Sequence, residues 1–394
     1  MGKNQKESCD LLVKLDGKEE VRASDTDTWK LRNGTDIMAL VIDQRLDMPD
    51  EFEIRFVARA EGKHAIFDWA KEGTKVELAF SYEKPIQPMF TGEVTYADVE
   101  YHADAEMGAF VSLRGYDKSH RLHRSHEAKA YGTGDQADQD PAQVASDIVQ
   151  NSGAVDASDG LNLSPGDAGV MSKYLPALQT PFESIKQLYG QTPSADHSAD
   201  GTIIFNKLSI QSNPVATICY EGKGKGVNPI GVMSARFSIA TYPIYAKVRV
   251  RGWDPKEKKA FVEEITSCSP DIDGAQANSG WESGWKATGK ALYNAADKGA
   301  VYDRVANWCE TKDEAKQLAQ SIFDQYSLQY LTGDVVVEGC PDIQPGVVVQ
   351  FAGFGDRVNG KVMVTSATHS LDAKANQTYT TSFAFCSNAA KPAK

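Results

Sequence analysis

Three strand-like segments occur twice in this chain in the same order, roughly 270 residues apart. The first reads Glu-Gly-Thr-Lys-Val-Glu-Leu-Ala-Phe at 72–80 and Pro-Gly-Val-Val-Val-Gln-Phe-Ala at 345–352. Self-similarity in a fixed order indicates a duplicated structural unit, and two copies are too few for a solenoid. We therefore predict a duplicated β-domain. The remaining segments are glycine-led strands from Gly92 and Gly360, then closing strands from Ala109 and Tyr379.

Two similar barrels in one chain offer two nearly equivalent surfaces to a ring-shaped partner, which favours an assembly component over an enzyme. A shorter similarity, between Arg114-Gly-Tyr-Asp117 and Arg251-Gly-Trp-Asp254, further supports the duplication. In both, a strand gives way to a glycine followed by an aromatic residue and an acid.

Composition narrows the class of protein. The 394 residues leave room for two to three domains, and the 41% hydrophobic and 24% charged residues are typical of a globular chain. A net charge of −12 argues against non-specific nucleic-acid binding, which needs clustered Lys and Arg. No run approaches the roughly 18 apolar residues of a membrane helix, so we expect no membrane insertion by this chain. Six well-separated cysteines without a CxxC pair are typical of reduced thiols.

The pattern of elements predicts a mainly β fold with an α+β insert. Period-2 alternation, as at Phe52, Ile54 and Phe56, indicates antiparallel strands with one buried face. Thr180–Glu183 and Thr311–Glu314 are capping boxes, which predict two helix starts. The expected division is a first β-barrel at 1–119, an α/β insert at 120–212, the first part of a second β-barrel at 213–267, a loop excursion at 268–305, the helix and closing strands of the second barrel at 306–388, and a flexible tail at 389–394.

Two groups of segments carry a family resemblance. Phe90-Thr-Gly-Glu-Val-Thr95 and Leu113–Leu122 resemble the late-control protein D family of contractile-tailed phages. The end of the chain resembles the hub portion of VgrG-like spike proteins of contractile injection systems and type VI secretion. There the matching segments are Gly339–Gly346, Gly353–Gly360, Val364–His369 and Tyr379–Phe383.

The resemblance implies a baseplate hub. In that family three chains form a ring, and each contributes two barrels similar to the tail-tube subunit. Such a homotrimer joins a hexameric tail tube to a trimeric spike and contacts other baseplate proteins. It also implies assembly into a tail-like particle. The N-terminal residues 1–7 are polar and contain no apolar stretch, so we expect synthesis in the bacterial cytoplasm without a signal peptide. The OB-fold and needle of fused VgrG-like proteins do not follow here, so the spike is a separate protein or the chain is a shortened form.

Basic residues and histidines gather in Lys118-Ser-His-Arg-Leu-His-Arg-Ser-His126. Imidazoles at close spacing can bind zinc, which makes His120, His123 and His126 weak metal candidates. Arg121 and Arg124 beside them oppose a cation. We therefore expect no metal site and interpret the segment as a basic connector, with both arginines as partner-interface candidates.

Trp281 and Trp285 stand four residues apart in a Gly- and Ser-rich segment. Tryptophan is enriched at interface hot spots, so both are partner-interface candidates, although packing onto their own domain is an equal alternative. We expect no cofactor and no catalytic residues, because Asp98, Glu100 and Asp104 match a solvated strand face. The alternatives left open are a tail-associated cell-wall hydrolase and a receptor- or carbohydrate-binding tail module.

Overall fold

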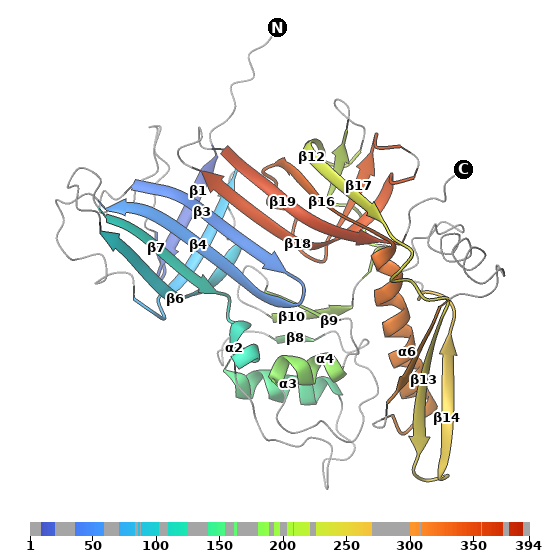
Figure 1. Ribbon diagram of the computed structural model, residues 1–394. Coiled ribbons are helices and arrows are strands. Elements are labelled where there is room, and N and C mark those ends of the chain that lie inside the picture. Colours follow the sequence, from blue (N-terminus) through green and yellow to red (C-terminus); the bar gives the residue numbers. More distant parts are fainter. Residues whose placement is uncertain are drawn as a thin grey trace.

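The computed structural model is dominated by strands (Figure 1). One 13-stranded sheet spans both halves of the chain, and two three-stranded sheets and a few helices accompany it. The structure describes residues 9–19, 36–58, 71–82, 86, 88–101, 109–124, 141–153, 161–163, 180–188, 193–197, 203–207, 209–220, 226–269, 300–306, 309–355, 357–372 and 378–388.

Six strands of the second half close into a barrel, here named the C-terminal barrel. They pair in the order β17-β11-β12-β16-β19-β18, and the β17–β18 pairing closes the ring. Alternate side chains fill its interior, for example Phe383 and Phe385. The expectation of a mainly β chain is confirmed. The strands are β11 (Ala216–Cys219), β12 (Pro229–Ile239), β16 (Leu331–Glu338), β17 (Val348–Ala352), β18 (Gly360–Asp372) and β19 (Thr378–Ser387).

The first half forms the N-terminal sheet, in the order β3-β4-β7-β6-β5-β1-β2. Phe52, Ile54 and Phe56 are buried in its core, as their alternation predicts. Among the described residues no pairing joins β1 to β3, so the expected first barrel is an open sheet wrapped around one core. The strands are β1 (Asp10–Leu15), β2 (Lys18–Glu19), β3 (Asp36–Arg45), β4 (Met48–Ala58), β5 (Lys75–Ser81), β6 (Phe90–Tyr101) and β7 (Ala109–Tyr116).

A two-residue turn joins β1 to β2. Asp16 and Gly17 both have positive φ, +48° and +75°, as a type I′ hairpin turn requires. Asp16-Gly17 is therefore the turn of a β-hairpin.

The two halves share an edge and part of a core. β18 pairs antiparallel with β3, which joins the C-terminal barrel to the N-terminal sheet. Leu371 and Tyr379, from the C-terminal barrel, belong to the buried core of the N-terminal sheet. Tyr379 packs edge-on against Phe80 of β5, with ring centroids 4.5 Å apart.

Three helices and a small sheet follow the N-terminal sheet and lie beneath it in Figure 1. The capping box at Thr180 is present: Thr180 Oγ1 accepts from the Glu183 N–H, and Glu183 accepts from the Thr180 N–H. The sheet has the order β8-β10-β9. The elements are α2 (His120–Arg124), α3 (Pro141–Ser152), β8 (Leu161–Leu163), α4 (Pro181–Leu188), β9 (Pro193–His197) and β10 (Ile203–Lys207).

Residues 213–267, grouped with the second barrel on sequence grounds, supply strands to two sheets. β11 and β12 enter the barrel, whereas β13 (Lys247–Asp254) and β14 (Lys259–Ile265) form a separate sheet with β15 (Val301–Val305). Arg251–Asp254 therefore lies in a different sheet from Arg114–Asp117. Because they belong to different sheets, the two segments are not equivalent. Four residues at the end of a strand do not show which strands lie beside it, so the sequence similarity could not reveal this.

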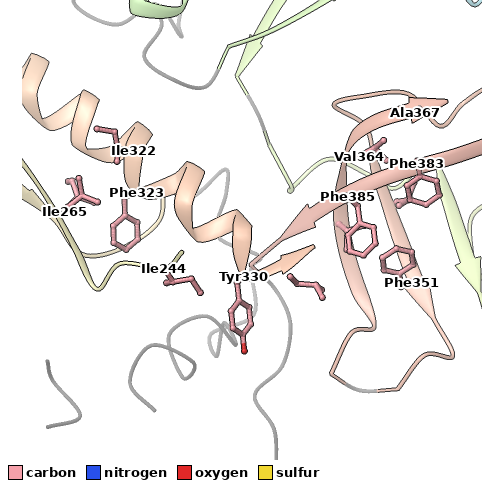
Figure 2. Close-up of a cluster of buried hydrophobic side chains, with 14 of the residues drawn as sticks. Ile244, Ile265, Ile322, Phe323, Tyr330, Phe351, Val364, Ala367, Phe383 and Phe385 are labelled. Carbon is pink, nitrogen blue, oxygen red and sulfur yellow. The ribbon is translucent and has the colours of Figure 1, made fainter. Parts of the chain in front are cut away.

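The amphipathic helix α6 (Lys312–Ser327) covers that sheet, and the capping box at Thr311 is present. Ile322 and Phe323 are buried and share a core with Ile265 (Figure 2). After α6 the short 3-10 helix η3 (Leu328–Tyr330) leads into β16, so the core continues into the barrel. Within the described residues, no helix is both long and apolar enough to span a membrane.

Candidate functional site

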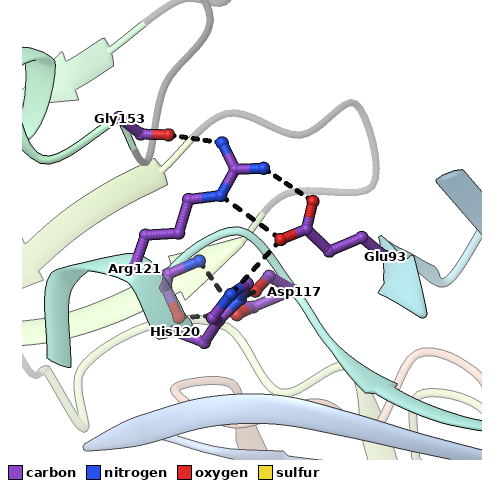
Figure 3. Close-up of polar contacts among 6 residues, drawn as sticks. Glu93, Asp117, His120, Arg121 and Gly153 are labelled. Atoms are coloured by element: carbon purple, nitrogen blue, oxygen red, sulfur yellow. Dashed lines mark hydrogen bonds and ion pairs between the residues drawn. The ribbon is translucent and has the colours of Figure 1, made fainter. Parts of the chain in front are cut away.

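The basic segment is held against the N-terminal sheet by a polar cluster of Glu93, Asp117, His120, Arg121 and Gly153, here named the α2 cluster (Figure 3). Glu93 projects from β6, and Arg121 donates to both of its carboxylate oxygens, at 2.6 and 3.3 Å. Arg121 also donates to the Gly153 carbonyl oxygen, at 2.6 Å. Gly153 directly follows α3, where a cation complements the helix dipole. One guanidinium thus ties α2, α3 and β6 together.

His120 is buried in the same cluster. Its Nδ1 lies 2.7 Å from the Asp117 carbonyl oxygen, and its Nε2 lies 3.2 Å from Glu93 Oε1. Burial lowers the pKa of His120, while the Asp117 carbonyl and the Glu93 carboxylate act in the opposite direction. The Asp117 carbonyl and the Glu93 carboxylate both only accept, so a neutral ring can donate to one of them at a time, whereas a protonated ring can donate to both. His120 is an internal connector in this arrangement.

The other predicted residues of this segment have different surroundings. The His123 ring stacks on Phe182 of α4, with centroids 4.3 Å apart. Arg124 is exposed, whereas Arg121, also expected to face a partner, makes its bonds inside the chain. His126 lies outside the described residues. Among the residues that the structure does describe, no three His, Cys, Asp or Glu side chains are grouped to hold a metal ion.

The remaining residues of interest are two tryptophans and three acidic residues. Trp281, Trp285 and Asp104 lie outside the described residues. Asp98 and Glu100 are exposed on β6.

The second site is the junction, defined as β18 residues 366–372 paired with β3 residues 39–45. Leu40, Ile42, Ala367 and Leu371 are buried there, with at most 2% exposure. On the other face, Thr368 Oγ1 donates to Asp43 Oδ1 at 2.9 Å. The junction therefore has a buried inner face, apolar apart from Gln44 and His369, and a polar outer contact.

His369 lies at the centre of the junction and is fully buried. Its Nε2 is 3.0 Å from the Ile343 carbonyl oxygen, and its Nδ1 is 2.9 Å from the Tyr379 hydroxyl. Since the carbonyl can only accept, Nε2 carries the proton and Nδ1 accepts from Tyr379. Burial lowers the pKa of His369 to about 4, so the ring is neutral near pH 7.

Sequence reasoning did not single out His369, Tyr379 or Asp43 as junction residues. A signal was present: His369 continues the period-2 series of Ala367 and Leu371, which predicts an inward-facing histidine. Its partner strand could not be identified, because β3 lies more than 300 residues away in the sequence.

Comparison with solved structures identifies chains with this fold. A tail protein from Neisseria meningitidis is 13% identical, with 97% of each chain covered and a TM-score of 0.65. The 43 kDa tail protein of prophage MuSo2 from Shewanella oneidensis is 12% identical, with 96% of this chain and 98% of that one covered and a TM-score of 0.60. This chain has the fold of phage tail proteins.

A third similar structure comes from Escherichia coli and is described as a component of the type VI secretion system with similarity to the T4 tail proteins gp27 and gp5. It is 13% identical, with 97% of this chain and 79% of that one covered and a TM-score of 0.51.

Sequence comparison adds little. The family model for the Alg8 N-terminal domain matches residues 197–373, less than half of the chain. That range ends after β18 and omits β19, although β19 lies between β16 and β18 in the C-terminal barrel. The match therefore does not correspond to a complete unit of this fold. No curated protein matches the chain.

Proposed function

We propose that this chain is the central hub of a contractile injection apparatus, a trimeric adaptor that joins a hexameric tail tube to a trimeric spike. The fold shared with phage tail proteins supports a structural role in a tail. The finer role rests on the idea that the N-terminal sheet and the C-terminal barrel are two copies of one unit.

Strand order supports that idea. Apart from the two-residue strand β2, the N-terminal sheet has the order β3-β4-β7-β6-β5-β1, and the C-terminal barrel has β12-β16-β19-β18-β17-β11. When the six strands of each half are numbered along the chain, these two orders are identical. The last pair differs in direction, since β1–β5 is antiparallel and β11–β17 is parallel.

Two β-bulges at matching places carry the proposal. In the N-terminal sheet, Met38 is the extra residue between Ile37 and Ala39 of β3. In the C-terminal barrel, Met233 is the extra residue between Val232 and Ser234 of β12, the strand with the same position in the order. Bulges are retained within families because they re-aim a strand, so a shared bulge is evidence of common descent.

The second bulge matches as well. Thr95 is the extra residue between Val94 and Tyr96 of β6, and Thr365 is the extra residue between Val364 and Ser366 of β18. The bulged residue type is therefore the same in both copies at both places.

A turn glycine binds each valine of this second bulge in the same way. Gly73 and Gly346 have φ of +81° and +84°, a conformation that favours glycine. The Gly73 N–H donates to the Val94 carbonyl at 2.7 Å, and the Gly346 N–H donates to the Val364 carbonyl at 2.8 Å.

Symmetry makes such a duplication useful. Three chains that each bring two similar units present six similar surfaces, which a hexameric ring can contact while the opposite side keeps threefold symmetry. We propose no catalytic role for this chain. A peptidoglycan suspension should stay turbid after the purified protein is added. Clearing of the suspension would favour the hydrolase alternative.

The mass of the purified full chain in solution tests the proposal. A mass of three chains is expected at micromolar concentration, because hub contacts are large and obligate. A stable monomer that also fails to join the particle would contradict the proposal.

A further inference from the structure

The large sheet contains a run of eight antiparallel strands with an incompletely paired edge at each end. The run is β12-β16-β19-β18-β3-β4-β7-β6. Its end strand β6 pairs with β7 along one side, but with β5 only through residues 90–93 on the other. Its other end, β12, pairs with β16 on one side and with β11 only through residues 229–231 on the other. Within the described residues, no strand pairs with the second edge of 96–101 or 234–239.

The matching bulges show which segments correspond to these edges. Val94 of β6 matches Val364 of β18, so residues 96–101 match residues 366–371. Ile37 of β3 matches Val232 of β12, so residues 234–240 match residues 39–45. The two incompletely paired edges are thus the counterparts of the two strands that form the junction.

Side chains of the two incompletely paired edges are more exposed than their counterparts in the junction, as expected for strands that lack a partner strand. The inward side chains of the junction, among them Leu40 and Ala367, have essentially no exposure. Their counterparts Ala235 and Ala97 are only half-buried. Tyr101, the counterpart of Leu371, is 66% exposed.

We propose that β6 of one copy of this chain pairs antiparallel with β12 of a second copy, repeating the junction between chains. The inference rests on the proposed trimer and specifies the contact that builds it. Transfer of the observed β18–β3 register places Ala97 opposite Ile239, Val99 opposite Phe237 and Tyr101 opposite Ala235 on the inner face, with Asp98 opposite Ser238 and Glu100 opposite Arg236 on the outer face.

The transferred register is chemically complementary at each of these positions. Every inner pair is apolar, whereas two of the three corresponding junction pairs, Ala367–Gln44 and His369–Ile42, each contain one polar side chain. The pair Asp98–Ser238 reproduces the Thr368–Asp43 hydrogen bond with the carboxylate and the hydroxyl exchanged between strands. Glu100 and Arg236 bring opposite charges together, and cross-strand pairs of opposite charge stabilise a sheet.

The direction of the strands also permits a closed ring. Neighbours along the run are antiparallel throughout, so β6 of one chain and β12 of the next meet in antiparallel orientation. The contact is head-to-tail, which closes into a ring when the rotation allows. Three chains would form one continuous sheet with eight strands from each chain, leaving none of these edges exposed to aggregation.

Cysteine cross-linking tests the register. Directly opposed strand residues have Cα atoms about 4.5–5.5 Å apart, within disulfide range. A full-length Asp98→Cys chain mixed with a full-length Ser238→Cys chain should give a covalent dimer under mild oxidation. The Asp98→Cys/Ser238→Cys chain should give a covalent trimer on a non-reducing denaturing gel.

Matched controls separate pairing from random collision. Asp98→Cys with Arg236→Cys is displaced by two residues, where diagonal Cα atoms lie about 7–8 Å apart, so at least tenfold less cross-linking is expected. Asp43→Cys/Thr368→Cys should form a disulfide within one chain, without a mass increase.

The outcomes are distinguishable. A trimeric mass without the 98–238 cross-link, or with equal cross-linking of the displaced pair, would overturn the strand pairing and leave the hub proposal standing. A monomer at all concentrations, without cross-links, would overturn both.

Discussion

Phe52 of β4 lies directly opposite Gly115 of β7, and in the C-terminal barrel the matching pair is reversed, with Gly333 of β16 opposite Phe385 of β19. In each pair the phenylalanine ring covers the glycine from the neighbouring strand. A Cβ on Gly115 would lie 2.7 Å from Phe52 Cε1 and 1.9 Å from the Glu93 carbonyl oxygen. A Cβ on Gly333 would lie 2.9 Å from Phe385 Cζ and 1.9 Å from the Arg236 carbonyl oxygen. Both units therefore pack a phenylalanine against a cross-strand glycine at this place, with the two residues exchanged between the strands.

Replacement of either glycine should therefore destabilise the fold. Gly115→Ala and Gly333→Ala should each lower the free energy of unfolding by about 1–3 kcal/mol, because the added methyl group meets backbone that cannot move away easily. Gly231→Ala is the matched control: a Cβ there meets nothing within 4 Å, so a change within about 0.5 kcal/mol is expected. Urea denaturation measures all three. Equal stability of Gly115→Ala and Gly231→Ala would contradict the close approach.

The buried His369 should make the fold sensitive to acid. Its pKa is about 4 in the folded chain, against about 6.5 when unfolded, so between these values the unfolded chain binds more protons. Stability contributed by His369 is complete above pH 6.5 and is lost as pH falls towards 4. The loss should be about 3 kcal/mol, from 1.36 kcal/mol per pKa unit.

His369→Gln isolates this effect, since His120 also has a lowered pKa and contributes in the same direction. The free energy of unfolding should be measured at pH 7 and pH 4.5 for both proteins. The variant should start less stable at pH 7 and lose less between the two pH values. An identical loss in both would show that His369 is not the responsible group.

The α2 cluster should stabilise the attachment of α2 and α3 to the N-terminal sheet. Arg121→Ala leaves Glu93 with fewer donors and should cost about 1–3 kcal/mol, the usual range for an unpaired, partly buried charge. Arg121→Lys keeps the charge but cannot make all three bonds, so an intermediate loss is expected. Limited proteolysis should show earlier cleavage between 120 and 212 in Arg121→Ala. Wild-type cleavage kinetics would argue that the cluster is not a connector.

The sequence suggests the proposed repeat, but the register of its two copies could not be read fully from the sequence. The turn glycines Gly73 and Gly346 and the closing strands at Ala109 and Tyr379 correspond as the sequence suggests. The glycine-led strands do not: the structure pairs Val94 with Val364, so Gly92 corresponds to Val362 rather than to Gly360. A two-residue shift keeps every side chain on its own face, so period-2 alternation cannot detect it.

The bulges and the junction were beyond sequence reasoning for a related reason. An extra residue such as Met38 interrupts the alternation of buried and exposed side chains. In the sequence the segment therefore looks like a weak strand, and the bulge is not visible. The α2 cluster was found as a basic segment, but its internal role depends on Glu93, which lies 27 residues before His120. Charge pattern alone does not show whether an arginine is bonded within its own chain or faces a partner.

The most direct test of the central claim is a reconstruction of the end of the tail tube in the assembled particle. The proposal predicts three copies of this chain, with N-terminal sheets and C-terminal barrels alternating around the axis at one height and about 60° apart, as six equivalent units require. One or six copies, or sheets and barrels in non-equivalent positions, would contradict it.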